Sequence, residues 1–190
     1  MKVGVLALQG ASREHAEALE ALGADPVAVL RPEHLGGVDA LVMPGGESTT
    51  IDKLLGTSGL RVPLAERIAD GLPVLATCAG LILCASEVVD GRPDQASFGC
   101  LDVTVRRNGF GSQRDSFEAP LTVRGLTGAA FCGVFIRAPL VERVGAAVET
   151  LAEYDGHPVL GRQGPVWFAS FHPELAGDLR IHQRFLNEVG

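Results

Sequence analysis

The sequence lacks any apolar stretch near the roughly 20 residues that a membrane-spanning helix needs, so no membrane span is expected. It also lacks a long run of lysine or arginine, and its formal net charge is −7. Proteins that bind nucleic acid normally carry basic patches, so this class of partner is not expected. Small molecules and other proteins are the expected ligands and partners.

Cysteine is scarce, and its spacing suits neither zinc nor a disulfide framework. The four cysteines include no Cys-x-x-Cys pair, so neither a metal site nor a disulfide is predicted, and no cofactor is expected. Cys84, Cys100 and Cys132 each lie among apolar residues, which predicts buried side chains. Only Cys78 has turn-forming neighbours.

Internal repeats and low-complexity linkers are also missing. The 190 residues are 46% hydrophobic, which is ample for the core of one domain, and we predict a single domain over residues 1–190. The first apolar run, residues 3–8, is too short for a secretory signal and is typical of a buried strand. We therefore expect a cytoplasmic protein.

Short apolar runs alternate with helical segments through the first half of the chain. This alternation predicts an α/β fold in which helices cover a parallel sheet. The expected strands are residues 3–8, 25–30, 39–43 and 72–77, and the expected helices are residues 12–22, 48–55, 62–70 and 79–85.

Strands predominate after about residue 97. We predict that this half adds strands, some of them antiparallel, to the same sheet. The expected strands are residues 101–105, 130–136, 146–151, 158–161 and 166–171, and the last helix is residues 178–189.

Cys78 lies where an apolar strand meets an apolar helix, with the small residues Ala76, Ala79 and Gly80 beside it. This pattern is typical of a nucleophile elbow, a strained turn that needs small neighbours. The unpaired N–H groups at such a helix start also favour a thiolate. Taken alone, a buried structural cysteine is the commoner outcome.

His172, Pro173 and Glu174 follow a strand near the C-terminus. Pro173 favours an extended conformation at His172, in which residues two apart point to one side, so Glu174 is expected to hydrogen-bond the imidazole. The second ring nitrogen then remains free as a base. With Cys78 at another strand end, these residues predict a nucleophile, a base and an orienting carboxylate.

The glycine-rich segment at residues 44–50 follows the strand at residues 39–43. Gly46 could donate a backbone N–H to an oxyanion together with the N–H of Ala79, the residue after the nucleophile. The segment lacks the Gly-Lys-Ser/Thr ending of a phosphate-binding loop. A plain helix entry capped by Ser48 explains the segment equally well when it is considered alone.

The other histidines, His15, His34, His157 and His182, have no ligand-like spacing, and surface or capping roles are predicted for them. The spacing of His172 and Glu174 also matches the His-x-Glu of zinc deaminases. Their signature needs a Pro-Cys-x-x-Cys further along the chain, and no cysteine follows Cys132, so that function is rejected.

Several linked motifs together resemble the glutaminase subunits of pyridoxal 5′-phosphate synthase, a family of class I, triad-type glutamine amidotransferases. The resemblance runs from about Val3 to the C-terminus. The motifs that carry it are residues 4–10, 44–50, 77–83, 135–139 and 170–175.

The resemblance implies a flavodoxin-like, three-layer fold around a mixed, mainly parallel sheet. It also implies hydrolysis of L-glutamine by Cys78, His172 and Glu174. The residues that match the family's glutamine-binding positions are Gly46, Glu47, Ser48, Arg107, Ile136 and Arg137.

The family passes its ammonia to a separate synthase subunit, a (β/α)₈ barrel that makes vitamin B6. Gln9 and the loop near Asn108 are expected to contact that subunit. Ser112 stands where the family usually has arginine, which puts the contribution of this loop in question.

Two other functions remain open from the residues alone. The elbow by itself is compatible with a cysteine hydrolase that acts on peptides or reactive carbonyls. The acidic charge and the altered loop at Ser112 are compatible with a regulatory binding module that has no activity.

Overall fold

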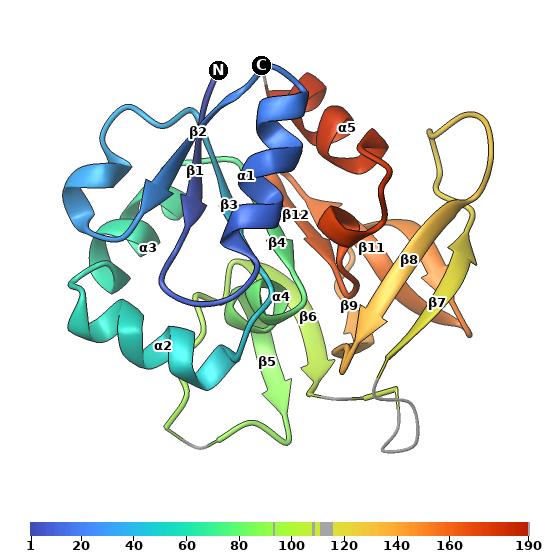
Figure 1. The fold of residues 1–190 in the computed structure, drawn as a ribbon. Coiled ribbons are helices and arrows are strands. Elements are labelled where there is room, and N and C mark those ends of the chain that lie inside the picture. The colour runs from blue at the N-terminus through green and yellow to red at the C-terminus, as the bar shows by residue number, and fades with distance from the viewer. Residues whose placement is uncertain (93, 108, 111–115, 190) are drawn as a thin grey trace.

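A seven-stranded sheet lies at the centre of the molecule (Figure 1). The computed structural model describes residues 1–92, 94–107, 109–110 and 116–189. The strand order is β10-β11-β12-β4-β3-β1-β2, in which the strands from β12 to β2 are parallel and β10 and β11 are antiparallel. Their bounds are β1 Lys2–Leu6, β2 Asp25–Val29, β3 Ala40–Met43, β4 Val74–Thr77, β10 Glu149–Tyr154, β11 His157–Gln163 and β12 Val166–Ala169. The predicted mixed, mainly parallel sheet is confirmed.

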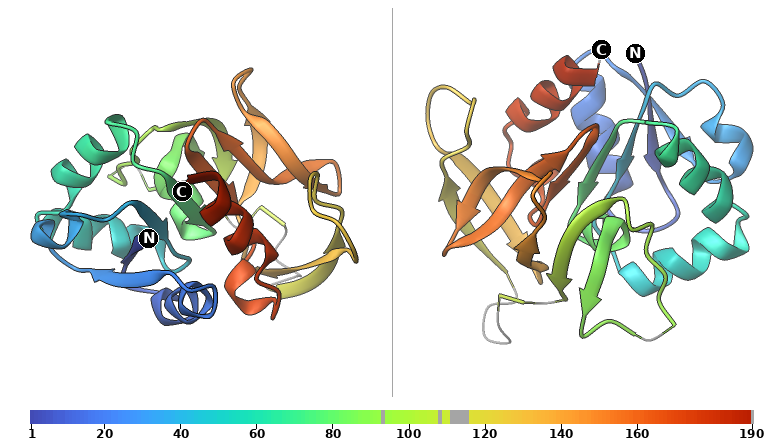
Figure 2. Two further views of the ribbon diagram at one scale, coloured as in Figure 1. Left: turned by 90° about the horizontal axis from the view of Figure 1, so that it is seen from above. Right: turned by 180° about the vertical axis from the view of Figure 1, so that it is seen from behind.

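Helices cover both faces of this sheet, so the fold has three layers (Figure 2). One face carries α1 (Ser12–Ala21) and α5 (Arg180–Val189), and the other carries α2 (Ser48–Thr57), α3 (Arg61–Ala69) and α4 (Ala79–Cys84). Two short 3-10 helices, η1 (Pro32–Leu35) and η2 (Pro173–Leu175), lie in connections. None of the helices in the described parts of the chain is long and apolar enough to cross a membrane.

Side chains of the central strands alternate between two apolar cores. In β3, Leu41 and Met43 pack in the core under α2 to α4, whereas Val42 packs in the core under α1 and α5. In β12, Phe168 faces the first core and Trp167 the second. A strand buried on both faces must be apolar throughout, which is why these strands are continuous hydrophobic runs in the sequence.

The predicted placement of the later strands is only partly correct. β10, β11 and β12 join the central sheet, but five other strands form two small sheets of their own. These sheets are β5-β6-β9 and β7-β8, with bounds β5 Ala85–Val89, β6 Leu101–Arg106, β7 Ser116–Leu121, β8 Phe131–Ile136 and β9 Leu140–Val144. Each packs one apolar side on a face of the central layer, through residues such as Val103 in β6 and Phe135 in β8.

The register of the parallel strands brings three strand ends together. Ala76 of β4 pairs with Met43 of β3 on one side and with Phe168 of β12 on the other. The chain segments that leave β3, β4 and β12 therefore emerge side by side at the carboxyl edge of the sheet, where open α/β sheets bind ligands.

Gly80 lets α4 lie directly against the backbone of β3. A Cβ added at Gly80 would lie 2.1 Å from the carbonyl oxygen of Met43, which no rotamer change can relieve. We expect Gly80→Ala to lower the free energy of unfolding by about 2–3 kcal/mol, measured by urea titration. Gly56→Ala in α2 is the matched control, since nothing lies within 4 Å of the added carbon. Equal stability of the two variants would contradict this expectation.

Candidate active site

Cys78 joins β4 to α4 in a strained turn. Its backbone has φ 48° and ψ −103°, a region that residues other than glycine rarely adopt. The N–H of Ala79 is the first of α4 and has no acceptor within the helix. The Sγ atom of Cys78 lies 3.9 Å from the carbonyl oxygen of Ile136. The predicted strand, strained turn and helix are therefore present around this thiol.

His172 and Glu174 form a close pair beyond the end of β12. The Nδ1–H of His172 donates to Oε1 of Glu174 at 2.7 Å, and the two side chains are 9% and 0% exposed. The predicted hydrogen bond between Glu174 and the imidazole is confirmed. The extended segment predicted to produce it is wrong, because Pro173 begins η2 and this 3-10 turn brings Glu174 back to the ring. The backbone N–H of His172 also donates to Val134 O at 2.8 Å, which ties the pair to β8.

The imidazole of His172 is electrostatically tuned. Burial disfavours its charged form, but the neighbouring Cys78 sulfur and the Glu174 carboxylate outweigh burial and raise the pKa of His172 to about 10. The ring therefore holds a proton at neutral pH beside the sulfur of Cys78.

The glycine loop between β3 and α2 presses against this pair. A Cβ at Gly45 would lie 2.3 Å from His172 Cε1 and 3.3 Å from Cys78 Cβ. The carbonyl oxygen of Gly45 accepts a hydrogen bond from Ala11 N at 3.0 Å, which fixes the orientation of the peptide that carries the N–H of Gly46. A Cβ at Gly46 would meet Gln9 Oε1 at 2.5 Å. Only glycine fits at these two positions without a shift of the neighbours.

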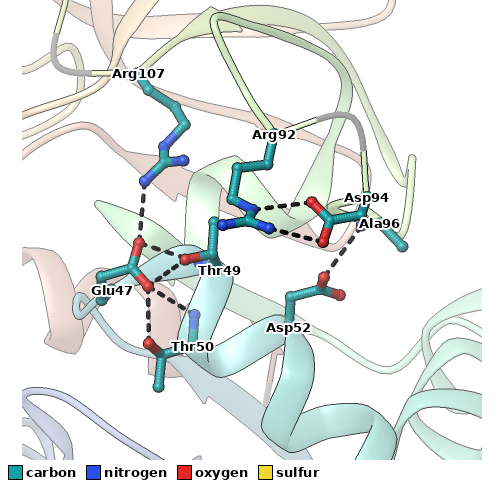
Figure 3. A network of polar contacts seen from close by, with 8 residues as sticks. All are labelled: Glu47, Thr49, Thr50, Asp52, Arg92, Asp94, Ala96 and Arg107. Atoms are coloured by element: carbon teal, nitrogen blue, oxygen red, sulfur yellow. Dashed lines mark hydrogen bonds and ion pairs between the residues drawn. The ribbon is translucent and has the colours of Figure 1, made fainter.

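Glu47, not Ser48, caps α2. Its carboxylate accepts hydrogen bonds from the backbone N–H groups of Thr49 and Thr50 and from both of their hydroxyls (Figure 3). The alternative of a helix entry capped by Ser48 is therefore wrong, because the longer Glu47 side chain reaches the backbone N–H groups of both Thr49 and Thr50. Among the described residues, the buried Oγ of Ser48 has no hydrogen-bond partner, which leaves it available to a ligand.

The two arginines of the predicted site differ in their surroundings. Arg107 donates to Glu47 Oε1 at 3.0 Å (Figure 3), whereas Arg137 makes no ion pair within the described part of the chain. Partial burial opposes the charge on Glu47, but the donors of Thr49 and Thr50 outweigh it and lower the pKa of Glu47 to about 2. Arg137 therefore brings the unneutralised positive charge to this wall.

A cavity of about 520 Å³ lies over Cys78. Its lining includes all the residues of the predicted site except Glu174, which lies behind His172. Those residues are Gly46, Glu47, Ser48, Cys78, Ala79, Arg107, Ile136, Arg137 and His172. The described residues contain no cluster of three or more side chains that could hold a metal ion.

Other lining residues were not singled out from the sequence. They include Gly10, Ala11 and Glu14 from the start of α1, and Ile82 and Leu175. Gly10 belongs to the segment at residues 4–10 that carries the family resemblance, whereas Ala11 and Glu14 have no comparable signal in the sequence. Gln9, a predicted partner contact, also lines the cavity and accepts from Glu47 N at 2.7 Å. Asn108 and Ser112 lie outside the described residues.

His15 and His182 are fully buried, so the surface or capping role predicted for them is wrong. His15 Nδ1 lies 2.9 Å from His182 Nε2, and His15 Nε2 lies 3.1 Å from Thr77 Oγ1 and 3.2 Å from Glu174 Oε2. Burial lowers the pKa of His182 to about 4. Burial and the neighbouring histidines His182 and His172 lower the pKa of His15 well below its ordinary value.

Known proteins match nearly the whole chain. The SNO glutamine amidotransferase family matches residues 5–190. A pyridoxal 5′-phosphate synthase subunit PdxT from Mycobacteroides abscessus is 57% identical over 187 residues, which cover 98% of this chain and 96% of the relative. The subunit PdxT from Frankia casuarinae is 55% identical over 188 residues, covering 99% and 94%.

Solved structures agree with these matches. A crystal structure of a glutamine amidotransferase superimposes with a TM-score of 0.93 at 51% identity, covering 99% of this chain and 98% of that one. The structure of PurLQS from Thermotoga maritima gives a TM-score of 0.67 at 16% identity, covering 100% and 99%, and shows likeness of fold alone.

The buried His182 makes stability depend on pH. Its pKa is about 4 in the folded chain and about 6.5 when unfolded, so the unfolded state binds more protons between these values. Stability is therefore lost as the pH falls through this window, and we expect His182 to account for roughly 2 kcal/mol between pH 7 and pH 5.

Urea unfolding at both pH values measures this loss. His182→Gln should reduce the loss by about that amount, since glutamine does not titrate. Phe185→Leu, a buried change on the same helix, removes no titratable group and should keep the wild-type pH dependence. An unchanged pH dependence in His182→Gln would be evidence against a buried neutral histidine.

Proposed function

The chain belongs to the SNO glutamine amidotransferase family, and we propose that it hydrolyses L-glutamine to L-glutamate and ammonia. One observation carries the proposal. A strained thiol, Cys78, lies beside a buried His172–Glu174 pair on the wall of a cavity large enough for a small polar ligand. This combination suits nucleophilic attack on an amide.

In the proposed reaction, the Cys78 thiolate attacks the carboxamide carbon of glutamine. The protonated ring of His172 gives its proton to the departing nitrogen, which leaves as ammonia, and a γ-glutamyl thioester remains on Cys78. His172, now neutral, takes a proton from water, and the resulting hydroxide attacks the thioester carbon, which breaks the C–S bond, releases glutamate and restores the thiolate beside protonated His172. Glu174 keeps the ring oriented throughout.

The N–H groups of Gly46 and Ala79 are the proposed donors to the oxyanion that forms on the carboxamide oxygen. The free N–H at the start of α4 supports the role of Ala79. Each such donor typically contributes about 3 kcal/mol of transition-state stabilisation.

The remaining cavity wall would hold the amino-acid end of the substrate. Arg137 is the proposed partner of the α-carboxylate, because Arg107 is already paired with Glu47. Ser48 Oγ is buried without a partner among the described residues and would add a hydrogen bond. Glu47, Arg107 and Ile136 complete the proposed glutamine site.

We further propose that the ammonia passes to a (β/α)₈-barrel synthase subunit for the synthesis of pyridoxal 5′-phosphate. The similarity to relatives named as PdxT subunits of pyridoxal 5′-phosphate synthase supports this partner. A protein-enclosed route would keep ammonia from being protonated in water before it is used. Gln9 and the loop around Asn108 are the proposed contacts.

Replacement of the nucleophile tests the proposed reaction. Glutamate release should fall by at least about 10³-fold in Cys78→Ala, measured with and without the synthase subunit, because no other thiol lines the described cavity wall. Cys132→Ser on β8 is the control and should keep wild-type activity. Turnover of glutamine by Cys78→Ala would contradict the proposal, and cleavage of peptides in place of glutamine would favour the cysteine hydrolase.

Gly45 offers a second test, which concerns the position of the proposed general base, His172. The methyl group of Gly45→Ala would displace the His172 ring, and a shift of about 1 Å can lower a rate about 10²-fold, so we expect a kcat loss of that size. Gly36→Ala is the matched control, since its nearest contact would be an ordinary 3.5 Å. Equal glutamate release by the two variants would show that the ring position tolerates the added carbon.

A further inference from the structure

The carboxylate of Glu174 is fully buried, and its two oxygens face different histidines. Oε1 accepts from His172 Nδ1 at 2.7 Å. Oε2 lies 3.2 Å from His15 Nε2, and no described residue makes a hydrogen bond to it. Both side chains of the second contact are 0% exposed. A buried carboxylate oxygen needs a donor, and His15 offers the one within reach.

The chemistry of the contact fixes which nitrogen of His15 holds the proton. An ionised carboxylate can only accept, so the nitrogen that faces Glu174 must be Nε2–H. Burial keeps His15 neutral, so Nδ1 is an acceptor. Nε2 of His182, 2.9 Å from that Nδ1, must then be the donor in the buried pair. The Nε2–H of His15 is shared with Thr77 Oγ1 at 3.1 Å.

We propose that His15 is a positioning residue of the catalytic site, whose Nε2–H holds the Glu174 carboxylate against His172, while His182 fixes the tautomer of His15. This inference rests on the proposed glutaminase function. His15 acts on the reaction only through Glu174 and does not line the cavity.

The arrangement orients the carboxylate from behind. With Oε2 held by His15, rotation about the last side-chain bond of Glu174 is blocked, and Oε1 stays aimed at Nδ1 of His172. The second acceptor, Thr77, is the residue before Cys78. His15 on α1 therefore contacts both the orienting carboxylate, Glu174, and the neighbour of the nucleophile. Groups that orient a catalytic ligand typically affect activity by about 10- to 100-fold.

Two substitutions at His15 distinguish the loss of its N–H donor from the loss of its side-chain volume. His15→Met fills the space without a donor, and we expect kcat for glutamate release to fall roughly 10- to 100-fold with KM for glutamine changed less than about threefold. His15→Gln places an amide N–H near the position of Nε2 and should recover most of the wild-type kcat. Assays contain the synthase subunit.

Leu19→Ala is the matched control. Leu19 lies on the same helix as His15, is fully buried and has an apolar side chain that makes no hydrogen bond. The substitution should therefore lower stability and leave kcat within about twofold. A wild-type kcat in folded His15→Met would overturn the inference while the glutaminase function stood. A loss in His15→Gln as large as in His15→Met would also overturn it.

A measurement without catalysis keeps the inference separate from the proposed function. ¹⁵N NMR of histidine-labelled wild-type protein should show His15 neutral with its proton on Nε2 at about pH 6 and pH 8, assigned by comparison with His15→Gln. A proton on Nδ1 or a charged ring would overturn the inference. Absence of glutamate release by the wild type would instead overturn the proposed function, and the NMR result would still decide the tautomer.

Discussion

Close approach of glycine backbone to neighbouring groups around Cys78 is the constraint on which the rest of the site depends. Three glycines make it possible, because a Cβ would lie 1.9 Å from Gly45 O at Gly10, 2.3 Å from the His172 ring at Gly45, and 2.1 Å from Met43 O at Gly80. These contacts tie the segments after β1, β3 and β4 into one unit. The strained turn at Cys78 persists because its surroundings leave no alternative path for the chain.

A second layer of the site is electrostatic. Glu174 contributes a negative charge that is removed from water, and histidines contact both of its oxygens. One of them, His172, is stabilised in its charged form, whereas the other, His15, is kept neutral by burial. The same carboxylate thus has one partner on the cavity wall, His172, which is the proposed proton donor, and another, His15, that belongs to the core. This difference follows from their positions at the cavity wall and beneath it.

The order of elements as far as α4 could be predicted from the sequence because each two-sided buried strand is a continuous apolar run. Small residues beside Cys78 also marked the elbow. The burial of His15 could not be predicted, since its neighbours in α1 are largely polar and its partner His182 is 167 positions away. Both Glu47 and Ser48 could have capped α2, and only the backbone path decides between them. The strands of the two small sheets have the expected apolar patterns, but no local feature of the sequence specifies which strand each of them pairs with.

The position of β12 has a consequence for the order in which the molecule is completed. This strand lies between β4 and β11 in the middle of the sheet, although it is among the last segments of the chain to be synthesised. A nascent chain that ends before β12 contains Cys78, but it lacks the strand that joins β11 to β4 and the His172 imidazole that follows that strand. The backbone N–H of Cys78 donates to Ala169 O of β12 at 2.8 Å, so this contact of the turn forms only once β12 has joined the sheet. The thiol therefore meets His172 and Glu174, the other members of the proposed catalytic group, only after the polypeptide is almost finished.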